Sequence, residues 1–382
     1  MTGHVRRRGK ASWEIKFDLG RDPATGERRI RYHSFKGTKR AAEIEAAKLV
    51  AKAADGEYVD PSKLALGAFL DRWQATWAPA NVSPKTLERY VELLSHVRST
   101  LGSIPLQKLR PAMLAELYGR LQCGKDNEGA GLAARTVGHV HRVLHRALGH
   151  AVQWELAAQN VAALVSPPRV ATQEIEIVKA DAIAPLLATL RGRPIYPIAA
   201  LALATGMRRG ELLALRWGDV DFDRGLVRVE RSLETTKSGL RFKAPKTKHG
   251  RRAITLPPTI VAELRAQWKA RQEQRLALGL GKAQGDALVF ADIEGLPLSP
   301  GAVSKAWKAA AVGAGLSVTF HALRHTHASQ LIAAGIDMLT ISRRLGHGSP
   351  TITLSVYGHL FSNVDDRSAS ILEATFASSK TE

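Results

Sequence analysis

The chain has 382 residues, 45% of them apolar, which is enough for two or three domains with separate cores. Its 55 Lys and Arg residues outnumber the 35 Asp and Glu by 20, and this positive charge favours a polyanionic partner, nucleic acid before a membrane surface. The single cysteine, Cys123, excludes an internal disulfide framework and a multi-cysteine zinc site; without a secretory signal or an apolar run of membrane-spanning length, we expect a cytoplasmic protein.

A small basic α+β module is expected over residues 1–60. Residues 13–19 alternate apolar and polar side chains, turn-forming residues follow, and a second strand is expected over 28–35. An alanine-rich helix is expected over 41–54. Within residues 1–40, twelve Lys and Arg against four Asp and Glu leave a charge of +8. The short sheet could therefore lie in a DNA groove, or it could be a solvated basic hairpin without a ligand.

An all-α domain is expected over residues 64–168. Its first helix is marked by large apolar residues at steps of three and four, which indicate one buried face: Leu66, Phe69, Leu70, Trp73 and Trp77. The next helix is expected to begin with Ser83 as its N-cap and Pro84 in its first turn.

The helix expected over residues 135–154 carries two stripes. One is apolar and indicates the core: Val137, Val140, Leu144, Leu148 and Ala151. The other is basic and could follow a phosphate backbone: Arg135, His139, Arg142, Arg146 and His150. We therefore take Arg135, Arg142 and Arg146 as candidate DNA-binding residues. His141 and His145 lie four residues apart, but no carboxylate or thiolate accompanies them, so a solvated face is favoured over a metal site.

A third domain, mainly α with some strands, is expected over residues 177–382. A helix should end at Gly206, so that Arg208 begins the next one, where Glu211 can pair with it and orient its guanidinium. Gly210 departs from a good helix start because glycine loosens the first turn.

Strands and two long helices follow in the third domain. Residues 237–252 form a basic, glycine-punctuated hairpin that places Lys248 on a mobile loop, with Lys246 as the competing lysine. The helix expected over 258–278 has four candidates for its inner face: Val261, Leu264, Trp268 and Leu276. Ser299 is expected to cap a further helix that ends near residue 313.

Residues 321–357 gather groups suited to phosphate chemistry. His321 and Arg324 lie three residues apart and share one face of a helix, which puts a cation beside a proton-transfer group. A second short helix is expected to stop at a glycine and present His347, and a lone phenol, Tyr357, comes ten residues later.

The order of these groups resembles the tyrosine recombinase (phage integrase) family. The motifs are, in chain order: Thr205-Gly206-Met207-Arg208-Arg209-Gly210-Glu211, Pro245-Lys246-Thr247-Lys248, His321-Ala322-Leu323-Arg324, Leu345-Gly346-His347 and Tyr357. The resemblance implies that DNA is cut and rejoined through a 3′-phosphotyrosyl bond, without a metal or another cofactor.

The resemblance also implies a role for each residue. Tyr357 would be the nucleophile, while Arg208 and Arg324 would donate bidentate hydrogen bonds to the nonbridging phosphate oxygens as negative charge develops there. Three further roles follow in the same way: proton transfer for His321, a hydrogen bond to the phosphate for His347, and protonation of the leaving 5′-oxygen for Lys248. Glu211 would hold Arg208, whereas His325, His327 and His359 are left as supporting or structural residues.

For partners, the resemblance implies double-stranded DNA with core-type and arm-type sites. Residues 1–60 would bind the arm-type sites and residues 64–168 the core-type sites, in a tetramer on DNA with an accessory DNA-bending or excision factor. The tail around Leu372 and Phe376 would dock on a neighbouring protomer or on its own domain. Three alternatives stay open: a resolvase of replicon dimers, a type IB topoisomerase, and a catalytically inactive DNA-binding regulator.

Overall fold

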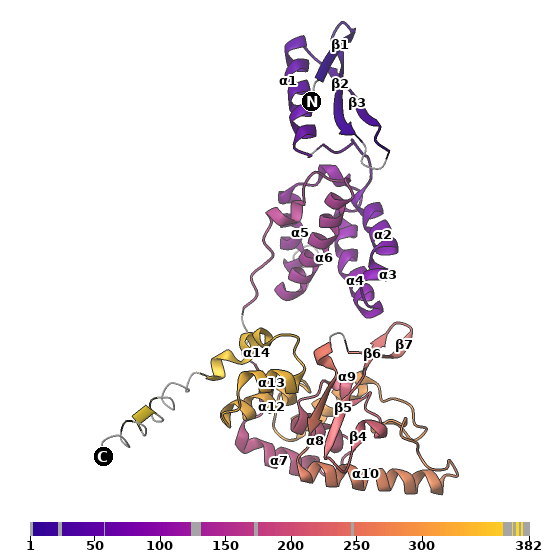
Figure 1. Cartoon of the computed structure of the whole chain (residues 1–382), viewed down its shortest axis with the longest axis vertical. Coiled ribbons are helices and arrows are strands. Elements are labelled where there is room, and N and C mark those ends of the chain that lie inside the picture. The colour runs from indigo at the N-terminus through magenta and orange to yellow at the C-terminus, as the bar shows by residue number, and fades with distance from the viewer. Residues whose placement is uncertain are drawn as a thin grey trace. The chain divides into compact units, whose positions relative to one another are not determined.

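The computed structural model describes residues 3–21, 25–56, 58–123, 131–171, 175–245 and 248–361, together with 369, 372–373 and 376. It divides into two compact units, Met1–Ala171 and Thr172–Glu382 (Figure 1). Unit 1 contains both the expected basic module and the expected helical domain, so the division of the chain into three domains stays a prediction. Among the described helices, none is both long and apolar enough to cross a bilayer.

Unit 1 begins with a three-stranded antiparallel sheet and one helix. The elements are β1 (Gly3–Gly9), β2 (Ser12–Arg21), β3 (Arg28–Lys36) and α1 (Lys39–Ala54), with β2 in the middle of the sheet. Ile15 and Phe17 alternate along β2 and pack under Leu49 of α1, as the period-two pattern predicts. Strand β1 was missed because its three consecutive arginines, 6–8, hide the apolar alternation. The turn expected after β2 lies partly outside the described residues.

The rest of unit 1 is helical. Its helices are α2 (Leu66–Thr76), α3 (Ala78–Asn81), α4 (Pro84–Leu101), α5 (Pro111–Cys123) and α6 (Ala134–Gln153), with short 3-10 turns η1 (Leu106–Lys108) and η3 (Val161–Leu164). Ser83 caps α4, accepting a hydrogen bond from the backbone nitrogen of Thr86 at 3.3 Å. The apolar stripes predicted for α2 and α6 are buried, except that Trp77 is only partly covered.

One prediction for α6 is wrong. His141 is not on a solvated face: it is 9% exposed, and its Nδ1 lies 3.0 Å from the hydroxyl of Tyr118 on α5. The histidine faces α5 because α5 packs against α6 and brings Tyr118 next to it. His145, one turn on, is exposed. Within the described ranges, no three side chains of the metal-binding types come together to hold an ion.

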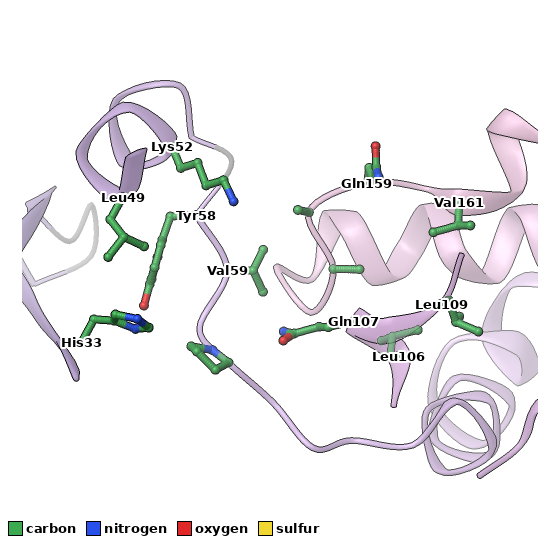
Figure 2. A pocket seen from close by; sticks show the side chains of 13 residues that line it. His33, Leu49, Lys52, Tyr58, Val59, Leu106, Gln107, Leu109, Gln159 and Val161 are labelled. Atoms are coloured by element: carbon green, nitrogen blue, oxygen red, sulfur yellow. The ribbon is translucent and has the colours of Figure 1, made fainter. Parts of the chain in front are cut away.

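A cavity of about 260 Å³ lies within unit 1 (Figure 2). Leu49, Lys52 and Tyr58 line it on the side of α1, and Gln107 and Val161 line it on the side of η1 and η3. It contains none of the candidate catalytic residues, so the reaction site has to be sought in unit 2.

Unit 2 combines a helical core with small antiparallel sheets. Its helices are α7 (Ala180–Leu190), α8 (Tyr196–Thr205), α9 (Arg209–Leu212), α10 (Pro258–Ala277), α11 (Pro300–Gly313), α12 (Ala322–Ala333), α13 (Met338–Leu345) and α14 (Pro350–Tyr357). Its strands are β4 (Val220–Asp221), β5 (Leu226–Val229), β6 (Ser232–Thr236), β7 (Gly239–Lys243) and β8 (Arg252–Thr255). Three 3-10 turns complete it: η4 (Trp217–Asp219), η5 (Lys248–Gly250) and η6 (Gly358–Phe361). The sheets have the orders β4-β5-β8 and β6-β7.

Helix α8 is the centre of unit 2. It is apolar on all sides and buried along most of its length, and it packs against α7, α10 and α12. On α10, Leu264 is buried and Val261 and Trp268 are partly covered, but Leu276 is 52% exposed, so its predicted place on the inner face is wrong. Leu276 lies in the last turn of α10, at the surface. Ser299 is the N-cap of α11, but its side chain does not make the expected capping hydrogen bond.

Gly210 has a packing reason that the sequence did not show. A Cβ atom at this position would lie 2.5 Å from the carbonyl oxygen of Leu233 and 2.6 Å from Oγ of Ser232. The glycine therefore lets strand β6 approach the first turn of α9 beside Arg208.

We expect Gly210→Ala to destabilise unit 2 by about 1–3 kcal/mol, because the added methyl group overlaps backbone that cannot move freely. Gly301→Ala, in the first turn of α11, is the matched control: its Cβ would lie 3.6 Å from the nearest atom, Oγ of Ser299. Urea unfolding of both variants measures the difference. Equal stability of the two variants would contradict the packing role of Gly210.

Candidate active site

The buried guanidinium of Arg324 joins three helices of unit 2. Arg324 is in the first turn of α12 and only 3% exposed; its Nη1 donates to the carbonyl oxygen of Gly206 at 2.6 Å and its Nη2 to that of Leu345 at 2.9 Å. These carbonyls belong to the ends of α8 and α13, which both turn at a left-handed glycine. Burial lowers the pKa of Arg324 to about 9, which still leaves it charged at neutral pH.

Arg208 is oriented by the carboxylate predicted to hold it. Its Nη1 donates to Oε1 of Glu211 at 2.8 Å, and its backbone nitrogen donates to Oε2 at 2.9 Å. Glu211 is buried, whereas the Arg208 side chain is 42% exposed and can meet a ligand. Burial alone would raise the pKa of Glu211, but Arg252 and Arg208 hold it below its ordinary value, so the carboxylate stays charged.

Arg252 supports the site, although sequence reasoning gave it no role. Its Nη2 donates to Oε2 of Glu211 at 2.9 Å, its Nε to the carbonyl oxygen of Arg344 at 2.7 Å, and its Nη1 to that of Gly250 at 3.1 Å. One side chain thus fixes the partner of Arg208, the end of α13, and the turn that contains Lys248. No local pattern could reveal this, because the Glu211 and Arg344 contacts span 41 and 92 residues.

Tyr357 is the last residue of α14 and is only 1% exposed. Its ring packs in an apolar cluster of residues from α12 and α13: Ala328, Ile332, Ile341 and Leu345. Its hydroxyl is hydrogen-bonded to Nδ1 of His325 at 2.8 Å. Burial raises the pKa of the phenol to about 12, while the charges of Arg324 and Arg208 act in the opposite direction.

The other two predicted histidines lie at the same place. His321 is the N-cap of α12, and its ring centroid lies 4.7 Å from that of His325. His347 follows the glycine that ends α13, and its Nδ1 lies 2.7 Å from Oγ1 of Thr353. Burial, then the charges of Arg324 and Arg208, lower the pKa of both imidazoles, that of His347 to about 4.

The structure therefore brings five of the six predicted catalytic residues together. Arg324 donates to the carbonyl oxygens of Gly206 and Leu345, which lie two residues before Arg208 and His347 respectively. The residue after Arg324, His325, is hydrogen-bonded to the Tyr357 hydroxyl and packs against His321. In Figure 1, α12, α13 and α14 lie side by side in unit 2, as their mutual contacts require.

The predicted lysines are described only in part, and the predicted DNA-binding arginines belong to unit 1. The backbone of Lys248 forms the start of η5, but its side chain and the whole of Lys246 lie outside the described residues. Arg135, Arg142 and Arg146 are exposed on α6 of unit 1, as expected for that stripe. Arg146 donates to the hydroxyl of Tyr90 at 2.8 Å.

His327, left as supporting or structural, has a structural position, whereas the side chain of His359 lies outside the described residues. His327 is buried; its Nδ1 lies 2.8 Å from the carbonyl oxygen of Leu203, and its Nε2 accepts from Nε of Arg344 at 3.1 Å. The Nδ1–H tautomer satisfies both contacts. Burial, then the charge of Arg344, lower the pKa of His327 to about 4.

This pKa predicts a loss of stability in acid. Between pH 6.5 and 4 the unfolded chain binds a proton at His327 that the folded chain does not, so stability present above pH 6.5 falls as the pH approaches 4. The full effect for one such group is about 3 kcal/mol. We expect His327→Asn, which keeps a donor for Leu203, to reduce proton uptake on unfolding near pH 5 by about one.

Urea unfolding of unit 2 at pH 5 and pH 7 tests this expectation. His249→Asn, at an exposed histidine of the same unit, is the control and should keep the wild-type pH dependence. If His327→Asn also kept the wild-type pH dependence of stability, His327 would have to be protonated in the folded chain at pH 5.

Unit 2 is mainly helical with small sheets and holds a buried phenol and two oriented arginines, an arrangement suited to the attack of a phenol on a phosphodiester. The profile described as the phage integrase family matches residues 176–363. The chain belongs to this family of tyrosine recombinases, and it is an integrase-type, site-specific DNA recombinase.

Relatives match along most of the chain. The "Tyrosine recombinase XerC-like" protein of Caldanaerobacter subterraneus subsp. tengcongensis is 25% identical over 94% of this chain and 95% of its own length. An integrase of Streptomyces ambofaciens is 28% identical over 95% of this chain and 93% of its own length.

Solved structures show the same fold. The Tn1549 transposon integrase in complex with transposon right end DNA matches with a TM-score of 0.66 at 20% identity, covering 80% of this chain and 99% of the solved one. The lambda integrase dimer bound to a COC′ core site matches with a TM-score of 0.56 at 21% identity, covering 92% of this chain and 93% of the solved one.

Proposed function

We propose that Tyr357 is the nucleophile of this recombinase and that Arg208 and Arg324 bind the phosphate it attacks. The observation that carries the assignment is a buried phenol hydrogen-bonded to His325, the residue next to Arg324, in the unit where Glu211 orients Arg208. A phosphodiester repels nucleophiles by its negative charge, and the transition state gathers more charge on the nonbridging oxygens. Fixed cations bind that state more tightly than the ground state, and they also favour the phenolate.

The remaining roles follow from the resemblance to the family. His347 hydrogen-bonds the phosphate, and His321 assists proton transfer from the start of α12. Lys248 protonates the leaving 5′-oxygen from the connection between β7 and β8, with Lys246 as the competing choice. The expected hairpin is wrong here, because β7 pairs with β6 and β8 with β5 in separate sheets. Glu211 holds Arg208 in place. The 3′-phosphotyrosyl bond stores the energy of the broken phosphodiester, so a second DNA strand can reverse the step without ATP.

The DNA arrangement is part of the same proposal. Residues 1–60, with their charge of +8 over the first forty, bind arm-type sites, and residues 64–168 bind core-type sites through Arg135, Arg142 and Arg146. Four protomers assemble on double-stranded DNA with an accessory bending or excision factor, and the solved lambda integrase tetramer bound to a Holliday junction supports this assembly. The element integrated or excised is a phage or another mobile element, and in a bacterial host the reaction takes place in the cytoplasm.

Plasmids that carry candidate attachment sites from the DNA flanking the gene test the function. We expect recombinant products only from paired sites, together with a covalent adduct on a nicked suicide substrate. Relaxation without recombination would indicate a topoisomerase, and resolution of direct repeats without intermolecular joining would indicate a resolvase. Binding without any adduct would indicate an inactive regulator. Each of these three results contradicts the proposal.

A further inference from the structure

The phenol of Tyr357 is paired with a histidine to which the family motif gives no role. His325 is one residue after Arg324 and one helical turn after His321 on α12. Its Nδ1 is 2.8 Å from the Tyr357 hydroxyl, and the two ring centroids are 5.6 Å apart at an angle of 60°. His321, which the resemblance implies for proton transfer, instead meets the edge of the His325 ring.

We propose that His325 is the base that accepts the proton of Tyr357 during DNA cleavage, acting through Nδ1 in the tautomer that carries its hydrogen on Nε2. The inference rests on the proposed assignment of Tyr357 as the nucleophile. The geometry already meets the first requirement of a general base, which is hydrogen-bond reach of the proton it removes.

Burial and the groups around His325 keep its nitrogen free to accept the proton. His321 and Arg324 face it from α12, Tyr357 from α14, and His347 from the turn between α13 and α14. Burial, followed by the neighbouring imidazole of His321 and the charge of Arg324, lowers the pKa of His325 to about 4, so the imidazole is neutral at pH 7. A protonated imidazole could not accept the phenol proton.

Burial, and not the neighbouring charges, holds the proton on Tyr357 until DNA arrives. With the pKa of the phenol at about 12 and that of His325 at about 4, transfer within the free protein is strongly unfavourable. The negative charge of a bound phosphodiester raises the pKa of both groups, but the phosphodiester also couples proton transfer to formation of the bond between the phenol oxygen and phosphorus. The base therefore works only when a phosphodiester is in place, and the free enzyme keeps a neutral phenol.

Atoms and charges balance in this step. The phenol proton passes to Nδ1 of His325 while the phenolate oxygen forms a bond to phosphorus. The bond between phosphorus and the 5′-oxygen breaks, and that oxygen takes a proton from the acid, proposed to be Lys248. Rejoining runs in reverse: the attacking 5′-hydroxyl gives its proton back to the acid, and the imidazolium of His325 reprotonates the released phenol.

Two variants separate a base from a structural partner. His325→Asn keeps an amide group close to the position of Nδ1, so it can still hydrogen-bond the phenol but cannot take its proton. His325→Ala removes both properties. We measure single-turnover cleavage of a nicked suicide substrate by the full-length protein between pH 6 and 9.

We expect both variants to cleave about 10²–10⁴-fold more slowly than wild type at pH 7, the usual contribution of a general base. Their rates should rise about tenfold per pH unit, because the phenol must then ionise by itself, whereas the wild-type rate stays nearly flat. Added imidazole should restore part of the His325→Ala rate. An Asn variant with wild-type rate and pH profile, or an Ala variant that imidazole does not rescue, would overturn the assignment.

Two controls keep this inference separate from the proposed function. A substrate with sulfur at the bridging 5′ position releases a thiolate that needs no proton, so it should rescue Lys248→Ala but not His325→Ala. Tyr357→Phe should form no adduct in the same assay. If it formed one, the choice of nucleophile would be wrong; if only His325→Ala matched wild type in rate and pH profile, the base alone would be wrong.

Discussion

Tyr357→Phe is expected to form no covalent adduct with a nicked suicide substrate while binding the same DNA within about twofold of wild type. The substitution removes only the attacking oxygen, and no second atom of phenylalanine can form a bond to phosphorus. The ring keeps its place in the cluster on α12 and α13, because phenylalanine fills nearly the same volume. Adduct is measured by denaturing gel electrophoresis and binding by native gel shift.

Tyr196→Phe is the matched control for this variant. Tyr196 also belongs to unit 2 and also loses a hydrogen bond, since its hydroxyl donates to Oε1 of Glu263 at 2.6 Å. We expect this variant to form adduct at close to the wild-type level. Adduct formation by Tyr357→Phe would show that another side chain attacks the DNA, and loss of adduct in both variants would point to a general loss of structure.

Arg252→Met is expected to destabilise unit 2 by about 3–5 kcal/mol, the usual cost of breaking a buried ion pair from one side. The change leaves Glu211 buried with its Oε2 short of a cation, and it leaves the carbonyl oxygens of Arg344 and Gly250 without their guanidinium donor. Cleavage should fall as well, because Glu211 then no longer holds Arg208 in one position. Lysine is not an adequate replacement, since its single ammonium cannot reproduce the three directions of the fork.

The neighbouring residue provides the control for Arg252. The Arg251 side chain is 64% exposed, and its Nε lies 3.6 Å from Oε2 of Glu230 at the surface. Arg251→Met should therefore change stability by less than about 1 kcal/mol. Chemical unfolding of the two variants under the same conditions makes the comparison. Similar losses of stability in both variants would mean that Arg252 acts as a surface charge and does not hold the site together.

Local sequence patterns were enough to predict much of the fold and the site. Period-two alternation placed β2 and β3, and steps of three and four placed the inner faces of α2 and α6. The pairing of Arg208 with Glu211 could be predicted because the two residues lie three positions apart at the start of one helix. These predictions succeeded because each depends on residues that are neighbours in the chain.

The features that were missed depend on distant partners. His325 meets Tyr357 across 32 residues, and Arg252 meets Arg344 across 92, so neither contact leaves a periodic signal. His141 was expected in solvent, yet Tyr118 of the preceding helix covers it. Gly210 was interpreted as a weak helix start, although β6 packs so closely that no side chain fits at this position. In each case the partner, and not the local pattern, decides what the residue does.

During cleavage, the Tyr357 oxygen is expected to become bonded to the 3′ phosphate of the cut DNA strand. Mass spectrometry of the protease-digested adduct from a suicide substrate tests it most directly. The peptide that contains Tyr357 should carry a nucleotide bound through its 3′ phosphate to the phenol oxygen. A nucleotide on any other residue, or one attached through its 5′ phosphate, would contradict the account.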